Sequence, residues 1–284
     1  MGILIGSRAL EVLDFWAKKK SIEKVILADN CCENLIDWAF LNIKEVVLLD
    51  IDSETKDINL DYLKFQVENN KIGEKLLIIW VWPYGLKPDA NKLKLIKNSG
   101  DCLILQDKCL ARPDLPFEYI MNENSDAELY STGYSKYCDL LFGGWLQDKH
   151  TINNNISNIV SKEDYFTSIE KRRLYVDTHK VLVNSELDKI TKNIKISDWN
   201  PKSWRYCLEV KNPLLYSKFI NENDAFSSCH YSSSKYLSKY NGKESIKHKK
   251  HVINLFNDLR ANNKYIDKIK KATDEYFNAL HNSM

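Results

Sequence analysis

Short apolar runs alternate with amphipathic segments along the first 146 residues, and this alternation restricts the chain to a layered α/β architecture. Several runs are continuously apolar, which is typical of strands covered on both faces. The segments between them have helical periodicity; Leu10, Leu13 and Trp16, for example, form one apolar stripe. Strands are expected at residues 2–5, 24–28, 45–50, 75–82, 102–106, 128–131 and 139–146, and helices at residues 7–20, 59–70 and 89–100. The pattern predicts an α/β domain with a mostly parallel sheet.

The texture of the sequence changes near residue 150, which predicts a large domain at 1–150 and a connecting helix with a smaller domain at 151–284. An Asn-rich polar link leads into a long helical stretch at residues 161–193. Beyond it, extended segments are expected at 203–210 and 226–233, and helices at 214–223, 244–256 and 264–280. This mixture indicates a small α+β unit at the C-terminal end.

Composition argues against several classes of partner. The 284 residues include 41 basic and 39 acidic side chains, which give a net charge of +2. This small charge does not predict binding to nucleic acids or membranes. The seven cysteines lack C-x-x-C spacing or a matching histidine set, which predicts reduced thiols and no metal site. The first residues have neither a basic leader nor a long apolar run. These features together predict a cytoplasmic protein.

Ligands of open α/β sheets bind beyond the carboxyl ends of the strands, so the residues that follow each apolar run are candidates for a site. Gly6 and Ser7 follow the first run, Asp107 follows the run at 102–106, and Ser131 with Lys136 follows the apolar "AELY" at 127–130. Each has an ordinary alternative: a helix N-cap for Ser7 and Asp107, and a solvated turn for Ser131 to Lys136. Taken in chain order, they match a site in which a helix N-terminus holds phosphate and a lysine forms a Schiff base.

The flanking sequence strengthens this interpretation. The blocks "VVLLDIDSETKDINLDYL" (46–63), "LLIIWVWPYGLKPDANKLKLIKNSGDCLILQD" (76–107) and "DAELYSTGYSKYCDLLFGGWL" (126–146) resemble those of the DegT/DnrJ/StrS family of pyridoxal-phosphate-dependent sugar aminotransferases. The segment "SSCHYSS" around His230 and Tyr231 is similar to the family's "V-H-Y-P". The resemblance implies a fold-type I large domain with a mostly parallel mixed sheet, followed by a small α+β domain.

Carried over by position, the resemblance implies that Lys136 is the catalytic residue and holds pyridoxal 5'-phosphate (PLP) covalently. Asp107 would pair with the ring nitrogen, Ser131, Ser7 and Gly6 would bind the phosphate, and His230 and Tyr231 would lie near the substrate. The implied reaction moves an amino group from a donor such as glutamate to a nucleotide-linked keto-sugar, in the synthesis of surface polysaccharides such as O-antigen or capsule. The family also implies a homodimer.

The sequence departs from the family pattern at several points, which leaves alternatives open. Leu110 replaces a glutamine and Cys32 replaces a ring-stacking aromatic residue, while the segment before the first strand and a region after Gly144 have no counterpart. One reading is an active, shortened enzyme. Another is a degenerate homologue that binds or regulates a partner without transaminase activity. A third is an unrelated nucleotide-binding protein, although the chain has no G-x-G-x-x-G or G-K-[ST] loop.

Overall fold

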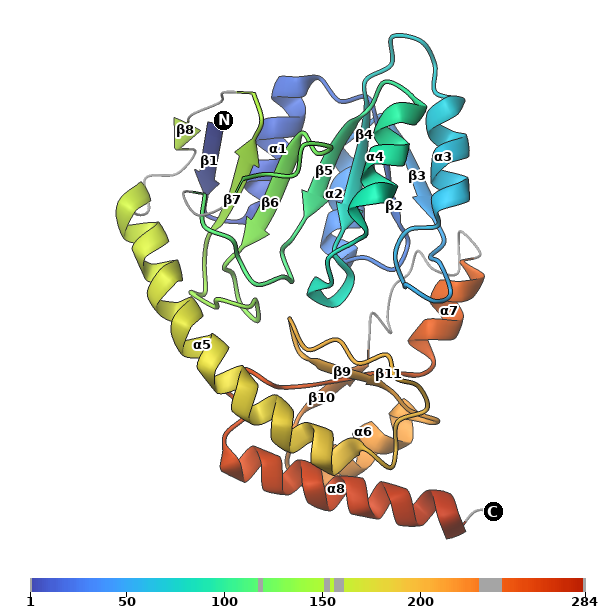
Figure 1. Cartoon of the computed structure of the whole chain (residues 1–284), viewed down its shortest axis with the longest axis vertical. Helices are drawn as coiled ribbons and strands as arrows, with labels where there is room; N and C mark the ends of the chain where they lie inside the picture. The colour runs from blue at the N-terminus through green and yellow to red at the C-terminus, as the bar shows by residue number, and fades with distance from the viewer. Residues whose placement is uncertain (1, 117–119, 151–153, 156–160, 230–241, 283–284) are drawn as a thin grey trace.

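A computed structural model describes residues 2–116, 120–150, 154–155, 161–229 and 242–282. Its larger sheet has eight strands in the order β3-β2-β4-β5-β6-β7-β1-β8 (Figure 1). The strands β2 to β6 are parallel, and β7 is antiparallel to both β6 and β1. The strands are β1 (Gly2–Gly6), β2 (Lys24–Ala28), β3 (Glu45–Leu49), β4 (Leu76–Val81), β5 (Leu103–Asp107), β6 (Ala127–Ser131), β7 (Gly144–Asp148) and β8 (Asn154–Asn155).

Helices cover both faces of this sheet. The helices α1 (Ala9–Lys20) and α2 (Glu33–Asn42) pack on one face, α1 against β1, β6 and β7 and α2 against β3. Their buried side chains Trp16 and Ile36 belong to the same apolar core as buried side chains of β2, β4 and β5. On the other face lie α3 (Leu60–Glu68) and α4 (Ala90–Ser99), and the first half of α5 (Lys162–Thr191) covers β1, β6 and β7. A short 3-10 turn, η1 (Pro83–Gly85), follows β4. Burial on both faces explains the continuously apolar strands.

A second, three-stranded sheet in the order β10-β11-β9 lies beyond the carboxyl edge of the large one, and α5 runs alongside both (Figure 1). Its core contains side chains of α5, α6 and α8, such as Leu187, Tyr216 and Ile269. The elements are β9 (Tyr206–Glu209), α6 (Pro213–Glu222), β10 (Ser227–Cys229), α7 (Lys243–Lys249), β11 (Val252–Leu255) and α8 (Asn263–Asn282). The predicted fold class, a mixed, mostly parallel large sheet with a small α+β unit, is therefore confirmed.

Two expected elements are wrong. Residues 139–143 form a turn instead of a strand, because Leu141 (φ 70°) and Gly143 (φ 97°) adopt left-handed backbone conformations before β7 begins at Gly144. Residues 244–256 divide into α7 and β11, since the apolar Val252 and Ile253 pair with β9 and β10 in the small sheet. The sequence pattern did not predict α2, which spans Glu33–Asn42. The domain boundary near residue 150 stays a prediction.

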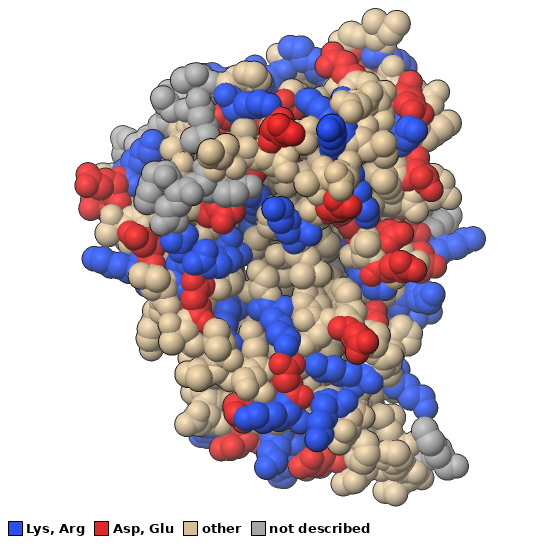
Figure 2. All heavy atoms as spheres, in the orientation of Figure 1, with Lys and Arg blue, Asp and Glu red and all other residues tan. Residues whose placement is uncertain are grey.

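The surface agrees with the near-neutral composition. Figure 2 shows Lys and Arg interspersed with Asp and Glu over the visible face, without a broad field of one sign. None of the described helices has a stretch long and apolar enough to cross a membrane. Among the same described residues, His, Cys, Asp and Glu form no group of three or more that could hold a metal ion.

A buried ion pair lies under the carboxyl edge of the large sheet. Lys108 Nζ is 2.8 Å from Glu128 Oε2, and both side chains are fully buried. Tyr130 donates to Glu128 Oε2 at 2.9 Å, Gln106 lies 3.4 Å from Glu128 Oε1, and the Trp82 ring centroid is 4.6 Å from Lys108 Nζ. Buried charges are tolerated only when they are paired and hydrogen-bonded. The network therefore joins β5, and the residue that directly follows it, to β6.

We expect Lys108→Met to lower the free energy of unfolding by about 3–5 kcal/mol, because Glu128 would keep its burial and lose its cation. Urea denaturation at pH 7 would measure the change. Lys189→Ala is the matched control: its ion pair with Glu186 is exposed, and its loss should cost at most about 1 kcal/mol. Equal effects of Lys108→Met and Lys189→Ala would contradict a structural role for the buried pair. Adding Glu128→Gln to Lys108→Met should restore part of the lost stability, because the buried carboxylate is then removed as well.

Contacts between α7 and the ends of β2 and β3 join the two sheets. The backbone N–H groups of Glu244 and Ser245 each donate to Asp50 at 3.0 Å, and the Ser245 hydroxyl hydrogen-bonds to Asp29. Asp29 is 1% exposed. Burial, together with the nearby Asp50 carboxylate, raises the pKa of Asp29 from 3.8 to about 7. A carboxyl that favours its protonated form therefore lies in the contact between the sheets.

This raised pKa predicts a pH dependence of stability. The folded protein retains the Asp29 proton up to about pH 7, whereas the unfolded chain releases it near pH 4, so the free energy of unfolding should fall between these values. The shift corresponds to about 4 kcal/mol at most. We expect Asp29→Asn to remove this part of the pH dependence in urea denaturation from pH 4 to 8. Exposed Asp61→Asn is the control, and an unchanged slope in Asp29→Asn would contradict the assignment.

Candidate active site

A cavity of about 590 Å³ opens at the carboxyl edge of the large sheet, where β1, β5 and β6 end. Four residues predicted from the sequence, Ser7, Asp107, Ser131 and Lys136, all line it. They come from segments up to 129 positions apart, so their convergence is a result of the fold. The other lining residues are Arg8, Ala9, Leu10, Cys32, Asn34, Leu35, Cys109, Leu129, Gly133, Leu141, Phe142 and Gly143.

The turn from Ser131 to Lys136 is held by backbone and side-chain hydrogen bonds. Lys136 N–H donates to the Gly133 carbonyl at 3.2 Å, and Gly133 N–H donates to Ser131 Oγ at 3.3 Å. Buried Thr132 bonds to the Phe142 carbonyl and to the Tyr165 hydroxyl, each at 2.7 Å. These contacts fix the backbone from which Lys136 extends. Its amine has no hydrogen-bond or ion-pair partner among the described residues, so it is available to a ligand.

Gly143 lets the following turn approach this segment closely. Its φ of +97° is unfavourable for other residues, and a Cβ atom there would lie 2.6 Å from both Thr132 Oγ1 and the Tyr165 hydroxyl. Close packing against the turn from Ser131 to Lys136 therefore explains the first glycine of the "FGGW" segment.

Asp107 ends β5 and is 8% exposed. Its Oδ1 accepts the Cys109 N–H at 2.9 Å, so the carboxylate caps the turn that follows the strand. Burial and the neighbouring Asp107 charge raise the pKa of the Cys109 thiol, which keeps this thiol neutral at the cavity wall. No helix follows β5 directly in the described part of the chain, so Asp107 is not the helix N-cap considered from the sequence. Its carboxylate instead caps a turn and lines the cavity.

The N-terminus of α1 differs from expectation. Ser7 lines the cavity, but its N–H and its hydroxyl both donate to Glu11 Oε2, at 2.7 and 2.5 Å. Gly6 ends β1 and is not among the lining residues; Val12 and Glu11 occupy the space that a side chain there would need. Arg8 is the cation at this end of the cavity, and its side chain makes no capping bond. The sequence interpretation missed Arg8, although its place beside "GS" at a helix start was the available signal.

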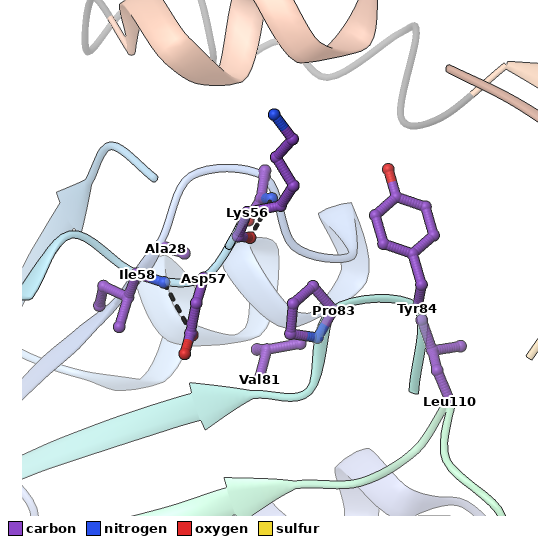
Figure 3. Close-up of a pocket in the computed structure, with 9 residues that line it drawn as sticks. Ala28, Lys56, Asp57, Ile58, Val81, Pro83, Tyr84 and Leu110 are labelled. Carbon is purple, nitrogen blue, oxygen red and sulfur yellow. Dashed lines mark hydrogen bonds between the residues drawn. The ribbon is translucent and has the colours of Figure 1, made fainter. Parts of the chain in front are cut away.

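The two departures from the family pattern lie in different places. Cys32 lines the cavity, together with Cys109. Leu110 instead faces a second, smaller pocket beside Tyr84, Pro83 and Val81 (Figure 3). That pocket has a free volume of about 10 Å³, room for one water molecule at most. His230 and Tyr231, predicted near the substrate, lie outside the described residues.

Comparisons with known proteins agree with this geometry at the level of fold. No protein-family model matches the chain, and no curated sequence does. Among solved structures, an aminotransferase from Psychrobacter cryohalolentis has a TM-score of 0.77 at 10% identity, covering 98% of this chain and 88% of that chain. A DegT DnrJ EryC1 StrS aminotransferase from Brucella abortus has a TM-score of 0.75 at 13% identity, covering 97% and 86%.

A sugar aminotransferase from Micromonospora echinospora is similar to the same extent, with a TM-score of 0.71 at 12% identity and coverage of 96% of this chain and 87% of that chain. The likeness runs through both sheets of the molecule. It confirms the resemblance read from the three sequence blocks: this chain has the fold of the DegT/DnrJ/EryC1/StrS sugar aminotransferases.

Proposed function

We propose that the protein is a PLP-dependent aminotransferase that acts on a nucleotide-linked keto- or amino-sugar. The observation that carries the proposal is the convergence of Lys136, Asp107 and Ser131 on one cavity of about 590 Å³, in the fold of sugar aminotransferases. A lysine, a buried carboxylate and a helix N-terminus are the groups that such a cofactor requires. A neighbour from Streptococcus pneumoniae has been solved in PLP and PMP forms, which supports the choice of cofactor.

The residues present fit this cofactor. The cavity is large enough for a substituted pyridine ring, and the first turn of α1 reaches it through Ala9 and Leu10. Arg8 and the Ser131 hydroxyl supply a positive charge and a donor for a phosphate. Asp107 Oδ1 accepts the Cys109 N–H, and the same carboxylate lines the cavity, where it would pair with a protonated ring nitrogen.

When bound, PLP supplies an electron-withdrawing ring that stabilises negative charge on the substrate carbon. The Asp107 carboxylate favours the protonated ring nitrogen on which that property depends. Lys136 Nζ, which has no competing acceptor among the described residues, moves the proton to and from the substrate carbon. Arg8, Ser131 and the first turn of α1 hold the phosphate and so orient the ring.

The finer parts of the proposal come from the family resemblance. An amino donor such as glutamate would supply the amino group, and the pathway would be the synthesis of surface polysaccharide. A cytoplasmic location suits nucleotide-linked substrates and reduced cysteines.

A second candidate function has its own support. Glu11 occupies both donors of Ser7, and its negative charge opposes a phosphate at the same helix end. Cys32 replaces a stacking ring at the cavity wall. A protein with these changes could retain the fold as a binding or regulatory partner and have lost transaminase activity.

Incubation with PLP tests the choice between the two. We expect visible absorbance from a lysine adduct, loss of that absorbance on adding glutamate, and, after borohydride reduction, a modified peptide that contains Lys136. Lys136→Ala should lower transamination by at least about 10²–10⁴-fold, the usual contribution of a proton-transfer group. Exposed Lys87→Ala is the matched control. A colourless protein that takes up no PLP would sink the enzyme proposal, and uptake without any response to amino donors would favour the second candidate.

We further propose that the protein is a homodimer. Leu141 and Tyr134, beside the cavity, are 75% and 70% exposed, and Phe142 is 37% exposed. A second copy would cover these apolar side chains. Light scattering over a range of concentrations should give the mass of a dimer, and Leu141→Asn should shift the equilibrium toward monomer. Asn tolerates the left-handed backbone of this position, so the substitution tests the surface without straining the turn. A monomer at all concentrations would contradict the proposal.

A further inference from the structure

A separate cavity of about 340 Å³ lies beside the small sheet, where β9 leads into α6 and α7 leads into β11. It is lined by three lysines, Lys211, Lys249 and Lys250, and by Asn212, Pro213, Leu214 and Cys229. Its volume is within the range of about 300–1,000 Å³ that is usual for sites of small ligands. It shares no lining residue with the candidate active site, so the two are distinct pockets.

The three lysines bring an uncompensated positive charge to this pocket. Their ammonium groups make no ion pair or hydrogen bond in the part of the chain that the structure describes, and no acidic residue is among those that line the pocket. The nearest acidic residues along the chain, Glu209 and Glu244, interact with His248 and Lys247 instead. Like charges at one pocket repel each other, and an anion from outside the chain would relieve that repulsion.

Backbone pairing in the small sheet brings these lysines together. Val210 N–H donates to the His251 carbonyl at 2.8 Å, so Lys211, after β9, and Lys250, before β11, lie on neighbouring segments. The basic run "KHKKH" at 247–251 supplies Lys250 together with Lys249. The positive pocket therefore depends on how β9 and β11 pair, because these lysines belong to separate parts of the sequence.

The other side of the pocket is apolar. Pro213 and Leu214 form the first turn of α6, and Leu214 is 72% exposed. The half-buried Cys229 ends β10. An apolar surface next to three ammonium groups suits a ligand in which a ring adjoins an anionic group. The N-terminus of α6 adds a partial positive charge to that of the lysines.

We infer that this pocket binds a phosphorylated small molecule that carries a ring, such as a nucleoside diphosphate, at a site outside the candidate active site. Lysine ammonium groups bind phosphate oxygens as point charges, and three of them match a group with several negative charges better than they match a carboxylate. Pro213 and Leu214 would contact the ring. The inference does not rest on the proposed function, since Lys136 lines a different cavity.

Alkylation of Cys229 tests the inference, because this thiol lines the pocket and a bound ligand would shield it. Burial raises the pKa of the Cys229 thiol, so labelling with iodoacetamide requires alkaline pH, where more thiolate is present. The probes are adenosine and uridine diphosphate, compared with pyrophosphate and glutarate at matched ionic strength, on the full chain without added PLP. We expect both nucleotides to slow the labelling of Cys229 saturably, pyrophosphate to protect more weakly, and glutarate to protect least.

Substitution of the lysines should weaken this protection. Lys249→Gln and Lys211→Gln should each lower the affinity for the nucleotides about tenfold, as the loss of a charge-assisted hydrogen bond predicts. Lys218→Gln is the matched control, because Lys218 also lies on α6 but pairs with Glu222 at 3.7 Å outside the pocket. Its affinity for the nucleotides should equal that of the wild type.

Cys32 and Cys109 line the candidate active site and serve as the internal reference. Nucleotides that shield these two thiols and leave Cys229 unprotected would overturn the inference, as would unchanged affinity in both Lys249→Gln and Lys211→Gln. Equal protection by pyrophosphate and the nucleotides would contradict a site for a ring. Protection by phosphatidylglycerol vesicles alone would contradict a site for a small molecule. Because no PLP is added, none of these results bears on whether the protein transaminates.

Discussion

The buried ion pair between Lys108 and Glu128 supports the two segments that carry the candidate site, the end of β5 and the turn after β6. It joins β5 to β6 at a depth where neither charge reaches solvent, and Tyr130 and Gln106 complete the hydrogen bonding of the carboxylate. Asp107 precedes this lysine directly, and Ser131 follows Tyr130. The Lys108–Glu128 pair therefore holds Asp107, at the end of β5, close to the turn from Ser131 to Lys136 that follows β6. Moving one strand relative to the other would leave a charge unpaired in an apolar interior.

A second set of contacts holds the small sheet over this edge. Asp50 accepts two N–H groups of α7, His248 lies between Tyr84 and Glu209 at 2.9 and 3.2 Å, and Arg205 reaches Ser135. All three contacts are polar and at least partly buried, and each joins a segment next to the large sheet to a segment next to the small one. Polar contacts fix relative orientation more narrowly than apolar packing does, because a hydrogen bond weakens steeply with distance and angle.

The electrostatics of the cavity are mixed, and the mixture bears on function. Arg8 and the N-terminus of α1 favour an anion, whereas Glu11 and Asp107 oppose one. The same helix end thus carries both the strongest argument for a phosphate site and the strongest argument against it. A phosphate at this helix end would compete with the Glu11 carboxylate for the two donors of Ser7. The phosphate carries the greater charge, whereas Glu11 is held in place by the chain.

The sequence by itself determined the layered α/β fold, since continuous apolar runs and helical periodicity have few other solutions. Positions at the carboxyl ends of expected strands also made Lys136, Asp107 and Ser131 site candidates, and the three residues line one cavity. It could not determine the turn at 139–143 or the division of 244–256 into helix and strand, because left-handed backbone and strand pairing depend on distant partners. Tertiary structure alone placed Glu11 on Ser7, Arg8 at the cavity, and Arg205 with Arg260 against Ser135. These contacts depend on how side chains lie in three dimensions, and local patterns in a single sequence do not encode that arrangement.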